Sequence, residues 1–153
     1  MRNFFVFALL GFVLLSFYMV NDVNADSKQN PVVLDSEFQI EEFVSGLFTP
    51  VNMEFIGDDL LVLEKNTGTV RHIKNNALLD APVLDVEVSN YGEQGLLGIT
   101  SIENDVYLFF TEAYHDGGRA LENRVYKYSW NGNELVEPIL LKKIPGFERE
   151  YVG

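Results

Sequence analysis

The feature that most constrains the fold of this chain is a succession of short segments of alternating or β-rich composition. They are about five to nine residues long and are separated by turn residues such as Asn-Thr-Gly and Asn-Asn. Gly and Asn adopt positive φ at low cost, so these turns are typical of hairpins. The segments are 38–47, 51–59, 60–68, 69–76, 83–88, 96–104, 105–113, 123–132 and 134–144. No stretch beyond residue 25 shows sustained helical spacing, which predicts an all-β chain.

Two parts of the chain follow the same loose plan. Residues 53–74 and 99–131 each contain an apolar strand, a tight acidic turn, a very apolar strand, a loop and a strand mixing basic and aromatic residues. This repeat favours the blades of a β-propeller. A blade takes roughly 40 to 50 residues, so the chain supplies two or three blades, whereas a closed ring needs at least about four. We therefore expect the amino-terminal part of a longer protein.

The first 25 residues have the parts of an export signal. Arg2 supplies positive charge, residues 4–20 are apolar and uncharged, and Val23-Asn24-Ala25 offers a small-residue cleavage site. We expect a signal peptide over 1–25, with an uncleaved membrane anchor as the alternative, and a polar tether over 26–37. The predicted location is the extracellular or cell-envelope space. The chain has no cysteine, so no disulfide stabilises it there.

The formal net charge of the 153 residues is −12. Such acidity disfavours nucleic acid and anionic membrane surfaces as partners, because both carry phosphate groups. A membrane contact is expected only if the signal stays uncleaved.

The motif Glu93-Gln94-Gly95-Leu96-Leu97-Gly98, followed by the strand Val-Tyr-Leu-Phe-Phe-Thr over 106–111, resembles the soluble glucose/sorbosone dehydrogenase family. The segment 46–73 resembles the opening blade of that family, and 123–135 resembles the strand that closes its next blade. The resemblance covers 38–153. It implies a six-bladed propeller that binds pyrroloquinoline quinone (PQQ) and calcium. Such a protein would oxidise a small sugar and pass the electrons to an external acceptor.

The resemblance also implies roles for particular positions. Gln94 matches a glutamine that faces the cofactor and substrate pocket, although an amide there could instead bond a loop backbone. Glu93 departs from the family, which often has glycine before the glutamine. The general-base histidine of the family would lie beyond Gly153, so we expect this fragment to be inactive and assign it no catalytic residue.

Neither histidine of the chain is expected to be catalytic. His115 lies in Tyr-His-Asp-Gly-Gly-Arg, a sequence that suits an active site in composition but falls in a hairpin loop between two predicted strands. His72 alternates with apolar neighbours on a predicted strand. The carboxylates of 40–43, 57–59 and 84–88 lack the spacing of a known calcium loop and are expected to be solvated. No metal ligand is assigned.

The leading hypothesis is therefore an exported PQQ-dependent aldose dehydrogenase, present as its first blades, that passes hydride from a sugar hydroxyl to the quinone. The alternatives are a secreted propeller that binds a glycan or protein without catalysis, and a propeller lactonase that uses calcium without a quinone.

Overall fold

All regular structure in the chain's described part is β-strand. The computed structural model describes residues 32–145, and the all-β prediction is confirmed over that range. The predicted signal peptide (1–25) lies outside the described residues, as do residues 26–31 of the predicted tether and residues 146–153. Within 32–145, no helix is long and apolar enough to cross a membrane.

The chain divides into two units, Met1–Glu41 and Glu42–Gly153. In the described part of the first unit, residues 32–41, the backbone N–H of Phe38 donates to the carbonyl of Asp35 at 3.2 Å and closes a turn. All of the strands among the described residues belong to the second unit.

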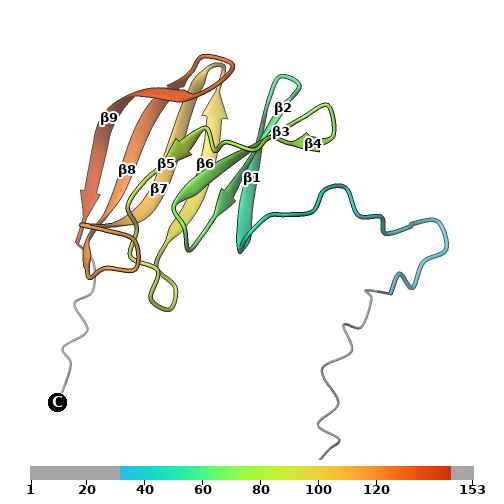
Figure 1. Cartoon of the computed structure of the whole chain (residues 1–153), viewed down its shortest axis with the longest axis horizontal. Helices are drawn as coiled ribbons and strands as arrows, with labels where there is room; N and C mark the ends of the chain where they lie inside the picture. The colour runs from blue at the N-terminus through green and yellow to red at the C-terminus, as the bar shows by residue number, and fades with distance from the viewer. Residues whose placement is uncertain (1–31, 146–153) are drawn as a thin grey trace, which may run out of the picture. The chain divides into compact units, whose positions relative to one another are not determined.

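The first sheet has five antiparallel strands (Figure 1), which pair in the order β1-β2-β3-β4 while β5 also pairs with β3. The strands are β1 (Pro50–Ile56), β2 (Asp59–Glu64), β3 (Thr69–Lys74), β4 (Ala77–Leu78) and β5 (Leu84–Asp85). Two-residue turns join β1 to β2 and β3 to β4. Asn75 and Asn76 between β3 and β4 have φ of 51° and 61°, the conformation of a type I′ hairpin turn.

The second sheet is a four-stranded antiparallel meander in chain order. Its strands are β6 (Leu96–Ile102), β7 (Asp105–Ala113), β8 (Ala120–Trp130) and β9 (Leu135–Ile144). Figure 1 shows β6 beside the first sheet and β9 at the far edge. An isolated bridge between Val88 and Glu112 ties the connection that precedes β6 to strand β7.

The main core lies between the two sheets. Strand β2 is buried on both faces, because Leu61 and Leu63 join this core while Leu60 and Val62 face the other side of the sheet. The second sheet contributes alternate residues of β7, among them Val106 and Leu108, as expected for strands of period two. The other side of the first sheet is covered by Val44, Leu47 and Leu78.

The strand predicted over 38–47 is wrong, since the structure has no strand there. Three of its apolar side chains stay exposed, Phe38 at 71%, Ile40 at 55% and Phe43 at 55%, whereas Val44 and Leu47 are half-buried against the first sheet. Alternation alone does not make a strand, because the backbone needs a partner edge, and residues 32–145 provide none for this segment.

Candidate functional site

Gln94 lies in the loop that leads into β6. Its backbone N–H donates to the carbonyl of Tyr91 at 3.1 Å, which closes a turn in which Gly92 has φ 59°. Its side-chain oxygen Oε1 accepts a hydrogen bond of 2.6 Å from the hydroxyl of the buried Ser89. The half-buried amide Nε2 makes no hydrogen bond within residues 32–145. Ser89 therefore orients the amide and leaves its N–H donors available for a ligand.

Gly95 brings this loop against the β2–β3 turn of the first sheet. The carbonyl of Lys65 accepts a hydrogen bond from Leu96 N at 3.0 Å. A Cβ on Gly95 would lie 2.5 Å from that same carbonyl oxygen, and the φ of Gly95 is 141°. Only glycine allows this close approach between the loop and the β2–β3 turn.

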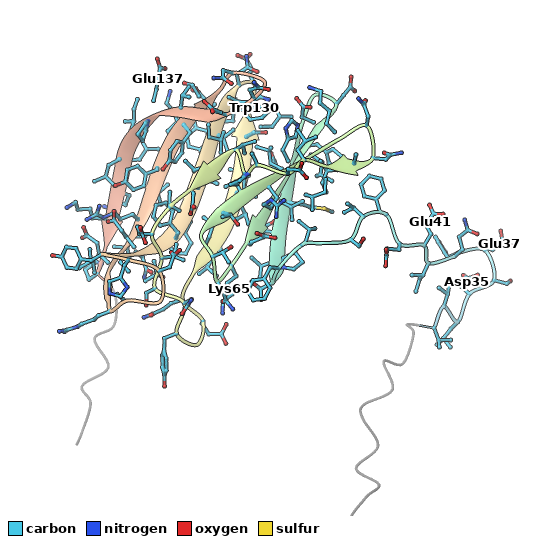
Figure 2. The ribbon with its side chains drawn as sticks, viewed as in Figure 1. Asp35, Glu37, Glu41, Lys65, Trp130 and Glu137 are labelled. Atoms are coloured by element: carbon cyan, nitrogen blue, oxygen red, sulfur yellow. The ribbon has the colours of Figure 1, made fainter. Side chains whose placement is uncertain are left out.

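Two further hydrogen bonds hold the loop on that turn. The ammonium of Lys65 donates to the carbonyl of Gly92, and Asn90 Nδ2 donates to the carbonyl of Asn66 at 3.0 Å. Figure 2 shows Lys65 at the end of the sheets that carries the β2–β3 turn, opposite the end where Trp130 lies. Leu96 is fully buried, whereas Leu97 is only half-buried.

The loop that carries His115 lies at this same end of the sheets. His115 is exposed, and its Nδ1 lies 3.1 Å from the carbonyl of Asp116. The carboxylate of Asp116 accepts from Val88 N at 3.0 Å, and Gly117 N donates to the carbonyl of Val88 at 2.9 Å. The predicted β7–β8 connection is confirmed, and it also anchors the residue that precedes Ser89. Sequence reasoning missed this contact; the side-chain capping tendency of Asp in Asp-Gly-Gly was the only signal for it.

Acidic side chains gather near this connection. Burial raises the pKa of Asp85, and the nearby carboxylates of Asp116 and Glu87 raise it further. Glu93, the residue that departs from the family pattern, is exposed. However, within residues 32–145 no three His, Cys, Asp or Glu side chains converge closely enough to hold a metal ion.

His72 is a buried residue of β3, in agreement with the prediction of a strand histidine. Its Nε2 lies 2.9 Å from the carboxylate of Asp59, which also pairs with Lys74 at 3.1 Å. Its ring meets the indole of Trp130 edge-on, with 5.2 Å between the ring centroids. Burial acts to raise the pKa of Asp59, but the hydrogen bonds from His72 and Lys74 outweigh it and leave that pKa lowered.

Together, the sheets have the fold of part of a β-propeller of the PQQ sugar dehydrogenase type. The chain is similar to an oxidoreductase (glucose dehydrogenase) from Thermus thermophilus, with 29% identity and a TM-score of 0.56 over 72% of this chain and 32% of that one. It is also similar to the PQQ-bound aldose sugar dehydrogenase of Streptomyces coelicolor, with 25% identity and a TM-score of 0.55 over 68% of this chain and 33% of that one.

A third structure, described as a glucose dehydrogenase, has 23% identity and a TM-score of 0.57 over 67% of this chain and 32% of that one, and it supports the fold alone. The chain thus spans about a third of the length of these neighbours. No protein-family model matches the chain, and no curated protein matches it in sequence. The resemblance stated from the Gln94 motif is confirmed by these structural neighbours.

Proposed function

We propose that this chain forms the first blades of an exported PQQ-dependent aldose dehydrogenase. The observation that carries the proposal is the structural similarity to a glucose dehydrogenase and to a PQQ-bound aldose sugar dehydrogenase, at 29% and 25% identity. The proposed substrates are small sugars, and the electrons pass to an external acceptor. Because the chain spans only about a third of the length of these neighbours, we assign it no general-base histidine and expect no turnover from the chain by itself.

Such an enzyme would use PQQ and calcium. Within residues 32–145, a suitable side chain is found for PQQ but no suitable set of ligands is found for calcium. Gln94 offers an oriented, half-buried amide whose N–H donors have no partner within residues 32–145. No set of three carboxylate or imidazole groups is present there for calcium, so no step is assigned to that ion. When bound, PQQ would supply the chemistry of hydride acceptance, which side chains lack.

The part of this chain in the proposed reaction is to bind and orient. The Nε2 of Gln94 would donate a hydrogen bond to an oxygen of the sugar or of the quinone. Ser89 holds the amide in one rotamer through its 2.6 Å hydrogen bond, which lowers the entropy lost on binding. The backbone clamp between Leu96 and Lys65 fixes the loop that carries both residues.

The direct test uses the full-length protein that carries this chain. Reconstituted with PQQ and calcium, it should reduce an artificial dye when supplied with aldoses. Gln94→Ala should lower kcat/KM by about tenfold or more, the loss expected for one hydrogen bond to a bound ligand. Glu134→Gln, an exposed change in the β8–β9 turn, is the matched control and should leave kcat/KM unchanged.

Two outcomes would contradict the proposal at different levels. If the full-length protein neither binds PQQ nor reduces dye with any aldose, the proposed function is wrong. If it is active and Gln94→Ala matches the wild type, the function stands but Gln94 is not part of the pocket.

A further inference from the structure

The two sheets are built on one plan, and their strands match position by position. Each sheet begins with two strands joined by a two-residue turn; β2 begins at Asp59 and β7 at Asp105, so equivalent positions in these strands are 46 residues apart. The carboxylate of Asp59 lies 2.9 Å from His72 Nε2 on β3. The carboxylate of Asp105 lies 2.9 Å from Lys127 Nζ on β8, so even this pairing is repeated.

The contact between the two sheets joins two different faces of this plan. Figure 1 shows β6 lying beside the first sheet. The residues buried in the shared core are Ile56, Leu61, Leu63 and Val70 of the first sheet and Ile99, Val106 and Leu108 of the second. The two groups do not occupy equivalent positions, since they alternate along the strands. The contact is therefore head-to-tail, and each sheet keeps its other face outside it.

The outer face of the first sheet is apolar where β1 crosses it. Val51, Met53 and Phe55 alternate along β1 and are 48%, 58% and 64% exposed; we call them the first outer face. Met53 is the equivalent of Ile99, which is only 9% exposed because it packs in the core. The first outer face therefore repeats a surface that the second sheet uses for docking.

The outer face of the second sheet repeats the complementary surface. Its apolar residues, which we call the second outer face, are Ile102, Tyr107, Phe109 and Val125. They are the equivalents of Ile56, Leu61, Leu63 and Val70, the last by its pairing with Leu63 as Val125 pairs with Phe109. Ile102 is 66% exposed and the other three are half-buried, whereas all four equivalents are buried in the contact.

We propose that the second outer face of one copy of this chain docks on the first outer face of a second copy. The contact would repeat the one between the two sheets within a copy. A head-to-tail contact leaves one face of each kind free, so it continues until a ring closes. Each copy covers about a third of the propellers that it resembles, so the ring is expected to contain three copies. The inference depends neither on PQQ nor on catalysis.

The chemistry of the two faces predicts a reversible contact. Apolar side chains on both faces favour docking. The hydrogen bonds from Ser101 to Glu54 have no counterpart, because the equivalent positions are Phe55 and Thr100. The net charge of −12 opposes association, so added salt should strengthen it by screening.

The test measures the mass of the full 153-residue chain by size-exclusion chromatography with light scattering, at several protein and salt concentrations. The wild type should approach the mass of three chains as both concentrations rise. Phe55→Glu and Ile102→Glu each place a charge on one outer face, and each should weaken association at least about tenfold. Leu34→Glu is the matched control, since Leu34 is 97% exposed outside both faces and this variant should associate as the wild type does.

Mixing the two variants tests the head-to-tail geometry. Phe55→Glu keeps the second outer face and Ile102→Glu keeps the first, so an equimolar mixture should form pairs with the mass of two chains. Pair formation also shows that both variants are folded. The proposal is overturned if the wild type stays monomeric at every concentration, if either variant alone associates as the wild type does, or if the mixture stays monomeric. A wild-type mass that settles at a number of chains other than three would contradict the ring.

Discussion

At the scale of single residues, Gly95 is a position where the fold leaves no room for a side chain. A Cβ there would meet the carbonyl of Lys65, and the φ of 141° is unfavourable for any other residue. We therefore expect Gly95→Ala to lower the free energy of unfolding by about 2–4 kcal/mol, from strain and overpacking together. Urea unfolding followed by circular dichroism measures this change.

Gly92 is the matched control for that substitution. It lies in the same loop with φ 59°, but a Cβ there would meet nothing within 4 Å. Gly92→Ala should lower the free energy of unfolding by only about 1 kcal/mol, the strain of an alanine in the left-handed conformation. Equal losses for the two variants would show that the contact with Lys65 does not matter.

The pair of Asp59 and His72 gives a prediction with a pH window. The pKa of Asp59 is lowered in the fold, so its carboxylate adds stability above the unfolded value near 3.8 and loses that contribution as pH falls through the folded value. Asp59→Asn, which still accepts a hydrogen bond, should lower the free energy of unfolding by about 1 kcal/mol at neutral pH.

The difference between Asp59→Asn and the wild type should shrink as pH falls below 3.8, because the wild-type carboxyl then becomes neutral as well. Chemical unfolding across the acid range measures it. A difference that stays constant with pH would mean that the charge of Asp59 contributes nothing.

At the scale of the strands, β1 and β6 are held together across the two sheets. The carboxylate Oε1 of Glu54 on β1 accepts hydrogen bonds of 2.7 Å from both the N–H and the hydroxyl of Ser101 on β6. Glu54→Ala leaves these donors without the charged partner and should cost about 1.5–3 kcal/mol. The neighbouring Met53 is 58% exposed, and Met53→Ala should change stability by less than about 0.5 kcal/mol.

Comparing the two variants by thermal unfolding tests whether the contact between the sheets is specific. A loss for Glu54→Ala no larger than that for Met53→Ala would contradict the role given to this carboxylate.

What the sequence predicts well at this scale is local. The hairpin turns follow from the residues in them, as at Asn75-Asn76, and the buried strands follow from their runs of apolar residues. Contacts between segments that are far apart in the sequence do not follow from local composition. Residues 38–47 alternate correctly but have no partner strand, and Leu84–Asp85 is all that the predicted segment 83–88 forms as strand. Asp116 and Val88 are 28 residues apart, so the Asp-Gly-Gly sequence suggests that Asp116 accepts a backbone hydrogen bond but does not identify Val88 as the donor.

At the scale of the whole molecule, the two sheets match about a third of the propellers that they resemble. Residues 32–145 form only one side of the pocket proposed at Gln94. That side is the loop between Ser89 and Gly95, which contacts the β2–β3 turn. Gln94 was identified from a motif, whereas its orientation by Ser89 required the folded loop.

The central claim is that Gln94 faces a PQQ and sugar pocket. A crystal structure of the full-length protein with PQQ and an aldose tests it most directly. The account predicts that Gln94 Nε2 lies within about 3.2 Å of an oxygen of the quinone or the sugar, with the hydrogen bond from Ser89 retained. A structure in which PQQ and the sugar bind away from the loop between Ser89 and Gly95 would contradict it.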